Sequence, residues 1–331
     1  MTGDAAGSWP VIGHDWAVAH LSRALAHGRM RHAYLITGPD QVGKTTLARA
    51  FAAALNCTGA QPPCGQCRAC TLIARDAHPD VTVIAAEAGG NTLKIDQVRA
   101  LQQALALRPF EARYRVAILR NFHQANPAAA NALLKTLEEP APGVVLLLTA
   151  TSADLLLPTI VSRCQPLHLR PLPLQTVYQA LIQHWGAAPE QAQTLARLSG
   201  GRIGWAIRAL GDPALLTLRQ EALTTLMALL ESSRRDRFAQ IERLPQDKAT
   251  LTEVLGIWQS FWRDVVLAAR GSQAPVTNYD CAGQITALAL GAGAEQAERA
   301  LLATNRTLDY LYKNANTRLA LEVLALDYPG L

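Results

Sequence analysis

The feature that most constrains this chain is the stretch Gly-Pro-Asp-Gln-Val-Gly-Lys-Thr at positions 38–45. Apolar residues precede it over positions 33–36, and a helical pattern follows over positions 46–55. The order of strand, glycine-bearing loop and helix, with the spacing G-x-x-x-x-G-K-T, is typical of a phosphate-binding loop. An ordinary strand-to-helix turn is the alternative interpretation of the same residues. The motif therefore predicts an α/β domain whose first strand leads into an anion site.

The chemistry of this loop is local. Backbone N–H groups at a helix N-terminus favour bound anions, and glycines allow the tight approach. Lys44 would place its charge on the terminal phosphates, and Thr45 would offer its hydroxyl to Mg²⁺. The predicted nucleotide-binding residues are therefore Gly38, Gly43, Lys44, Thr45 and Thr46.

The length and composition indicate a folded protein of two or three domains. The chain has 331 residues, of which 50% are apolar and 17% charged, and its net charge of +5 permits contact with nucleic acid without requiring it. No uninterrupted apolar run is long enough to span a bilayer, so no membrane association is expected. Positions 1–10 lack the basic and apolar regions of a signal peptide, so a cytoplasmic location is expected.

Four of the six cysteines are concentrated between positions 57 and 70, namely Cys57, Cys64, Cys67 and Cys70. In a cytosolic chain such clustering indicates a metal site more than disulfides. Four thiolates without an open position favour structural zinc. An iron–sulfur cluster, a redox dithiol and unliganded thiols are the alternatives. The nearby His78 is expected to be a loop residue, because four thiols already complete the shell.

Strand-like and helix-like segments alternate through the first half of the chain. Short apolar runs predict strands at 81–85, 116–119, 144–148 and 166–169, and helical patterns cover 95–107 and 126–138. This alternation predicts a parallel sheet with helices on both faces. After position 173 only helices are predicted, first at 175–185, 190–199 and 203–210, and then from the turn at 211–213 to the last residue.

The residues after the predicted strand at 116–119 argue against ATP hydrolysis. In a phosphate-loop ATPase such a strand is expected to end in an acidic residue that holds Mg²⁺ and orients the attacking water. Here it is followed by Arg120 and Asn121. Neither side chain is an anionic ligand, and Arg120 would repel the metal. The alternative is that a different strand carries the acid, although no other apolar strand between positions 46 and 149 ends in aspartate.

Several segments together resemble the AAA+ subunits of bacterial clamp loaders. The most specific are Asn-Ala-Leu-Leu-Lys-Thr-Leu-Glu-Glu-Pro at 131–140 and Ser-Arg-Cys at 162–164. The resemblance is dense from position 11 to about position 170 and weaker beyond. Supporting segments lie at 11–14, 31–35, 57–70, 78–80 and 95–99.

The resemblance implies a fold and a role. The fold is a RecA-like AAA+ domain at 1–170 that carries the cysteine insertion, a small helical lid domain at 171–211 and a helical collar domain at 212–331. The role is loading of a ring-shaped sliding clamp onto primer–template DNA, in a hetero-pentamer with other loader subunits of the DNA polymerase III holoenzyme.

The resemblance also assigns residues. Arg163, in Ser-Arg-Cys, would act in trans as an arginine finger on the ATP of a neighbouring subunit. Arg99 aligns with a position that faces DNA, and a solvated helix face is the alternative. Gln41 stands where the family usually has a further glycine, so a backbone position tolerant of positive φ is expected to be lost. Gly204 occupies the place of an arginine in the lid, and the neighbouring Arg202 has the wrong register.

Three hypotheses follow. The first is a structural clamp-loader subunit that hydrolyses ATP poorly or not at all and so has no catalysis of its own. The second is an active motor ATPase that uses the same loop with ATP and Mg²⁺. The third is a stand-alone zinc-bearing DNA-binding protein, which the absence of a basic recognition helix disfavours. The replaced acids at positions 120 and 121 favour the first hypothesis over the second.

Overall fold

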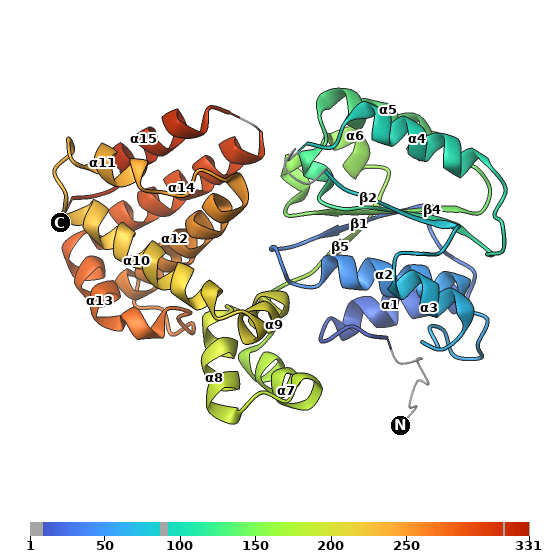
Figure 1. Cartoon of the computed structure of the whole chain (residues 1–331), viewed down its shortest axis with the longest axis horizontal. Coiled ribbons are helices and arrows are strands. Elements are labelled where there is room, and N and C mark those ends of the chain that lie inside the picture. Colours follow the sequence, from blue (N-terminus) through green and yellow to red (C-terminus); the bar gives the residue numbers. More distant parts are fainter. Residues whose placement is uncertain (1–8, 87–91, 314, 331) are drawn as a thin grey trace. The chain divides into compact units, whose positions relative to one another are not determined.

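The computed structural model describes residues 9–86, 92–313 and 315–330. The chain divides into two compact units, Met1–Leu172 (unit 1) and Pro173–Leu331 (unit 2), each described here by itself. All strands of the described residues lie in unit 1, and unit 2 is helical (Figure 1). The further division into lid and collar at positions 211 and 212 stays a prediction.

Unit 1 contains a five-stranded parallel sheet with the order β2-β3-β4-β1-β5. Its strands are β1 (Ala33–Thr37), β2 (Val81–Ile84), β3 (Arg115–Leu119), β4 (Val144–Ala150) and β5 (Gln165–His168). The register pairs Leu35 of β1 with Leu148 of β4 and with Pro166 of β5. The sequence-based prediction of a parallel sheet is therefore confirmed, and each predicted strand lies within a residue or two of its observed bounds.

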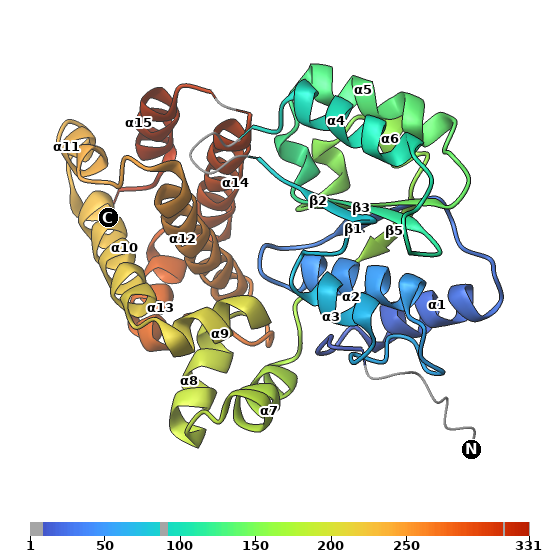
Figure 2. The same cartoon turned by 45° about the vertical axis from the view of Figure 1, so that its right-hand side comes forward.

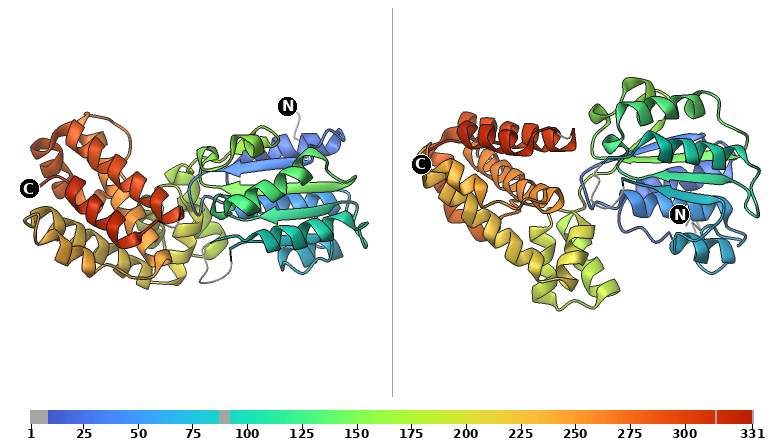
Figure 3. Two further views of the ribbon diagram at one scale, coloured as in Figure 1. Left: turned by 90° about the horizontal axis from the view of Figure 1, so that it is seen from above. Right: turned by 45° about the horizontal axis from the view of Figure 1, so that its top comes forward.

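Helices cover both faces of this sheet (Figures 1 and 3). One face carries α1 (Asp15–Ala26), α2 (Lys44–Asn56) and α3 (Arg68–Ala74), and the other carries α4 (Ile95–Ala106), α5 (Pro127–Glu138) and α6 (Pro158–Val161). Alternate residues of β1 supply two separate cores, because successive side chains of a strand point to opposite faces. Tyr34 packs with Phe51 of α2, whereas Leu35 belongs to the core on the other face, together with Leu133 of α5.

The beginning of α5 follows from its sequence. Asn126 precedes the helix in an extended conformation, and its side chain accepts a hydrogen bond from the backbone N–H of Ala129 at 2.7 Å. Pro127 occupies the first helical position, where its missing N–H costs no hydrogen bond. This capped start fixes where α5 begins, and hence where Glu138 at its last turn lies.

Unit 2 consists of helices packed around aromatic side chains. Trp258, Phe261 and Trp262 of α12 are fully buried at its centre. The helices are α7 (Leu174–Trp185), α8 (Pro189–Leu198), α9 (Ile203–Gly211), α10 (Ala214–Glu231), α11 (Arg237–Glu242), α12 (Lys248–Ala269), α13 (Ala282–Gly291), α14 (Gly293–Tyr312) and α15 (Thr317–Asp327). In the described part of the chain, no helix has both the length and the apolarity needed to cross a bilayer.

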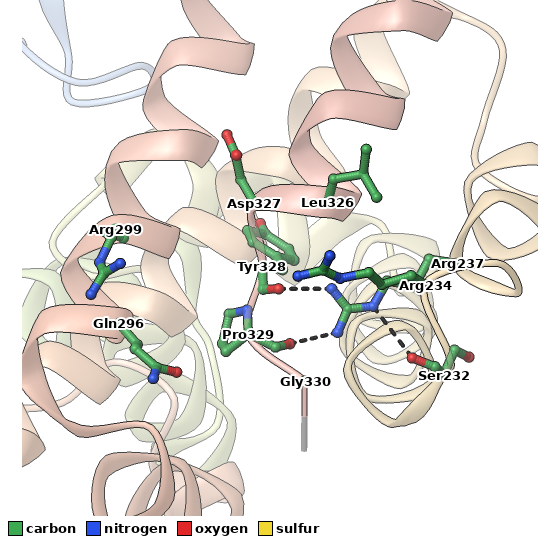
Figure 4. Close-up of a pocket in the computed structure, with 10 residues that line it drawn as sticks. All are labelled: Ser232, Arg234, Arg237, Gln296, Arg299, Leu326, Asp327, Tyr328, Pro329 and Gly330. Atoms are coloured by element: carbon green, nitrogen blue, oxygen red, sulfur yellow. Dashed lines mark hydrogen bonds between the residues drawn. The ribbon is translucent and has the colours of Figure 1, made fainter.

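A buried arginine ties the end of unit 2 to α11 (Figure 4). Arg237 is only 2% exposed, and one of its Nη atoms donates to the carbonyls of Ala325 and Tyr328, at 2.8 and 2.7 Å. The other donates to the carbonyl of Pro329 at 2.7 Å. Burial, and next the charge of Arg234, lower the pKa of Arg237. The guanidinium thus replaces water for carbonyls that the end of α15 leaves without helical partners.

Replacing Arg237 should therefore destabilise the protein. Arg237→Leu leaves those carbonyls without their charged donor, and the free energy of unfolding should fall by about 3 kcal/mol. Urea unfolding followed by tryptophan fluorescence measures the loss, with the exposed Arg235→Leu as the matched control. Equal stability of the two variants would contradict the prediction.

Candidate functional site

The phosphate-binding loop joins β1 to α2 at the carboxyl edge of the sheet. Gly38 has φ 143°, and a Cβ there would lie 2.3 Å from the carbonyl oxygen of Leu169, so only glycine fits. Gly43 has φ 112° and forms the start of α2. His14 supports the loop from α1's N-terminal end, because its Nε2 donates to the carbonyl of Val42 at 2.9 Å. The predicted strand–loop–helix geometry is present.

Gln41 keeps the backbone conformation that was expected to be lost. Its φ is 64°, in the left-handed region that normally favours glycine. That expectation is therefore wrong: the loop retains its course with a side chain at this position. The backbone at Gln41 is therefore strained, because a non-glycine residue in this region costs about 1–3 kcal/mol of free energy.

Lys44 is folded back onto its own loop. Its Nζ donates to the carbonyls of Gly38 and Pro39 at 2.7 and 2.8 Å and lies 3.4 Å from a carboxylate oxygen of Asp40. The side chain is 6% exposed, and burial lowers the pKa of Lys44, while the Asp40 carboxylate opposes that shift. To bind a phosphate group, the ammonium must exchange these oxygens for those of the ligand. Thr45 and Thr46 follow in the first turn of α2.

The residues at the end of β3 do not form a metal site. β3 lies one strand away from β1, so its end shares the carboxyl edge with the loop. Arg120 is exposed, and its backbone N–H donates to the carbonyl of Ile84 at 2.8 Å. Asn121 has φ 47°, and its N–H donates to the hydroxyl of Thr149 at 2.9 Å. Among the described residues, none that directly follows a strand is acidic.

His123 is a residue that the sequence analysis missed. It lies in the turn after β3, where burial lowers its pKa to about 4. The charge of Asp40 opposes this shift and that of Lys44 adds to it, so His123 lies close to both loop residues. At neutral pH its imidazole is therefore uncharged. Its only signal in the sequence is its short distance from the end of a predicted strand.

The four cysteines converge. Cys57 lies at the C-terminus of α2, Cys67 precedes α3 and Cys70 lies within α3, and together with Cys64 their sulfur atoms all lie within 4.8 Å of one another. Backbone N–H groups of Gly59 and Cys64 each donate to the Cys57 sulfur at 3.3 Å. Such a set of sulfur atoms can hold one tetrahedral ion.

Local hydrogen bonds and burial shift the pKa values of the thiols in opposite directions. Burial raises the pKa of Cys70 to about 12. Burial also opposes ionisation of Cys67, but hydrogen bonds prevail and lower its pKa to about 6. His78 lies outside this group, because its Nδ1 accepts from the backbone N–H of Asp80 at 3.1 Å. Its predicted place as a loop residue agrees with this contact.

Arg163 lies just after α6 and before β5, at the amino edge of the sheet. Its Nη2 lies 2.7 Å from a carboxylate oxygen of Glu138, and its Nη1 donates to the carbonyl of Thr159 at 2.9 Å. The side chain is 35% exposed. The two most specific segments, 131–140 and 162–164, thus meet through this ion pair, and the guanidinium keeps further donors for a ligand.

Arg99 has a different environment. It lies in the first turns of α4, its side chain is 64% exposed, and its one described partner is Asp96 at 3.9 Å. An ion pair this exposed contributes little stability. The structure brings Arg99 together with none of the other predicted residues in a described contact, so a DNA contact and a solvated helix face both remain as interpretations.

Comparison with known proteins assigns the family. A family model described as "DNA polymerase III, delta subunit" matches residues 13–173, almost the whole of unit 1. The delta' subunit of Pseudomonas aeruginosa DNA polymerase III is 38% identical over 195 residues, which are 57% of this chain. Residues 13–173 therefore belong to the DNA polymerase III clamp-loader family. The tau subunit of Escherichia coli is 33% identical over 232 residues, which are 67% of this chain.

The similarity extends over part of each relative. The chain spans 58% of the Pseudomonas aeruginosa delta' subunit, 36% of the Escherichia coli tau subunit and 30% of the gamma/tau subunit of Mycobacterium bovis, to which it is 38% identical over 178 residues. A gamma subunit-related protein from Thermotoga maritima has a similar solved structure, with a TM-score of 0.44 and 17% identity, over 92% of this chain and 97% of that one.

The lowered pKa of His123 predicts a specific pH dependence of stability. A histidine whose folded pKa is lowered contributes stability above its unfolded pKa of about 6.5, and loses it as the pH falls towards about 4. Between pH 7 and pH 5 the loss should be about 2 kcal/mol. Urea unfolding at both pH values should give a smaller loss for His123→Gln. The exposed His27→Gln serves as the control, and identical pH dependence of the two variants would refute the assignment.

Proposed function

We propose that this protein is the delta' subunit of a bacterial DNA polymerase III clamp loader, which hydrolyses ATP poorly or not at all. The observation that carries the proposal is the pair Arg120 and Asn121 at the end of β3, where a phosphate-loop ATPase needs a carboxylate for Mg²⁺. The hydrogen bonds of Lys44 to its own loop carbonyls support it, because they compete with a phosphate ligand.

In this proposal the chemistry of the subunit lies at Arg163. A guanidinium at the amino edge of the sheet, held on one side by Glu138 and Thr159, can present its other donors to a γ-phosphate bound by a neighbouring subunit. The proposed partners are gamma/tau-type and delta subunits in a hetero-pentamer, the sliding clamp and primer–template DNA. The proposed location is the cytoplasm, and the delta' relative from Pseudomonas aeruginosa supports the assignment of the subunit type.

An active ATPase of the gamma/tau type is the second candidate. It is favoured by the gamma/tau relatives, whose matches cover 52% to 67% of this chain. The delta' and gamma/tau relatives have similar identity to this chain, so identity alone does not separate the two subunit types. What separates them is whether Mg²⁺–ATP is turned over at Lys44.

Turnover by the isolated chain distinguishes the two candidates. We expect no hydrolysis of Mg²⁺–ATP above the level of the Lys44→Ala variant, because Arg120 and Asn121 stand after β3 where a carboxylate would hold the metal. In the reconstituted loader, Arg163→Ala should abolish ATP hydrolysis at one site per loader. The reason is that an arginine finger raises the rate of hydrolysis by a factor of roughly 10³–10⁵. Single-turnover hydrolysis measures that loss, with Arg170→Ala as the control.

Two results would count against this function. Turnover by the isolated chain that depends on Lys44 would place the gamma/tau-type ATPase first. An unchanged amount of ATP hydrolysed per loader in the Arg163→Ala variant would remove the trans-acting role of this arginine.

We further propose that the four cysteines hold a structural zinc ion. The convergence of the sulfur atoms and the N–H donors to the Cys57 sulfur both suit bound thiolates. The ion would join the end of α2 to the start of α3, and no catalytic step is assigned to it. The predicted iron–sulfur alternative would reveal itself by visible absorption.

Removal of the metal should therefore destabilise the chain. The purified protein should contain about one zinc per chain, and Cys64→Ser should lower that content. At free zinc about 100-fold above the Kd, the metal should add about 3 kcal/mol to the free energy of unfolding. Metal analysis and unfolding with and without a chelator test this, with Cys281→Ser as the control. Stable, metal-free protein would exclude a structural zinc.

A further inference from the structure

A basic hollow lies on unit 1, away from the phosphate-binding loop. It has a volume of about 370 Å³ and is lined by three arginines and two histidines, namely Arg23, Arg29, Arg31, His20 and His27. These residues belong to α1 and to the loop that leads into β1. The neutral part of the lining includes Tyr34 and Gln165.

None of the described residues that line this hollow is acidic. In the residues that the structure describes, Arg23, Arg29 and Arg31 form no ion pair with a carboxylate. Other arginines of the same unit do have such partners, as Arg49 has in Asp76 and Arg163 has in Glu138. Like charges within a Debye length of one another repel when no opposite charge neutralises them. An anionic partner would therefore reduce the electrostatic repulsion among these arginines in the isolated chain.

The position of the hollow relates it to Arg163. Tyr34 of β1 pairs in register with Gln165 of β5, and Arg163 precedes Gln165 by two residues. His32, at the start of β1, hydrogen-bonds the carbonyl of Leu137 at 3.1 Å, directly before the Glu138 that holds Arg163. The hollow and Arg163 therefore lie on the same amino edge of the sheet (Figure 2 shows α1 and α2 along the adjoining face).

We propose that this hollow receives an acidic segment of the neighbouring subunit whose ATP Arg163 contacts. The proposal rests on the proposed function, because that function brings another subunit against this edge. Guanidinium groups bind carboxylates in paired, directional hydrogen bonds, so three of them fit a loop or helix end that carries aspartate or glutamate. Such a contact would steer association and set the register in which Arg163 meets the neighbouring site.

The shape of the hollow favours a protein segment over nucleic acid. A volume of about 370 Å³ takes a few side chains, and the basic residues of the lining come only from α1 and the loop that follows it. A groove that follows phosphates along a strand of DNA would spread its charges over several elements. Nucleic acid is therefore the alternative that the experiment must separate.

The experiment compares two triple variants of the full chain. Arg23→Gln/Arg29→Gln/Arg31→Gln removes three charges from the hollow. The control, Arg75→Gln/Arg108→Gln/Arg113→Gln, removes three exposed charges from the same unit, outside the hollow. The Kd for the cognate gamma/tau-type subunit is measured at low and high ionic strength. The hollow variant should bind about tenfold or more weakly at low salt and lose most of its salt dependence.

The outcomes separate this inference from the function on which it rests. Equal Kd values for the two triple variants overturn the inference, and so does a loss confined to binding of a fluorescent primer–template DNA by the assembled loader. Failure of the unaltered chain to bind the gamma/tau-type subunit overturns both. If the hollow variant binds the gamma/tau-type subunit more weakly but Arg163→Ala leaves ATP hydrolysis unchanged, the docking site is supported and the arginine finger is excluded. Unfolding curves of both variants exclude misfolding as the cause.

Discussion

The burial of one parallel sheet on both of its faces is the constraint on which the rest of unit 1 depends. Every residue of β1 and β4 is buried, so each strand must supply apolar side chains to two cores at once. Because the strands are parallel, all carboxyl ends meet at one edge and all amino ends at the other. The phosphate-binding loop and Asn121 are brought together by this rule, and so are Arg163 and the basic hollow.

Much of this architecture could be predicted because its determinants are local. The four apolar residues at 116–119 form β3, and the Asn126–Pro127 pair marks the start of α5, as expected for a buried strand and a capped helix. The cysteine spacing predicted the convergence of four sulfur atoms, since Cys64, Cys67 and Cys70 lie within seven residues of sequence. In each case the residues that define the feature are near one another in the chain.

Most of the features that escaped prediction depend on contacts between distant residues. His14 supports the loop across 28 positions of sequence, and Arg237 reaches carbonyls about ninety residues away. The closeness of His123 to Lys44 follows from the strand order, in which β3 lies near β1 despite a large separation in sequence. The conformation of Gln41 was judged from residue preference, but the surrounding loop overrides that preference.

The placement of Lys44 and Arg163 at opposite edges of one sheet gives unit 1 a polarity. Strands of about five residues separate the two edges by roughly 15 Å, so neither residue can serve the other's site within one chain. A two-fold dimer pairs identical surfaces, whereas these two surfaces differ and can meet only head to tail. In such an array each catalytic site would lie between two neighbouring subunits. A subunit that donates an arginine but lacks metal-binding acids would end the series of catalytic sites. The assembly would then have a defined first and last position.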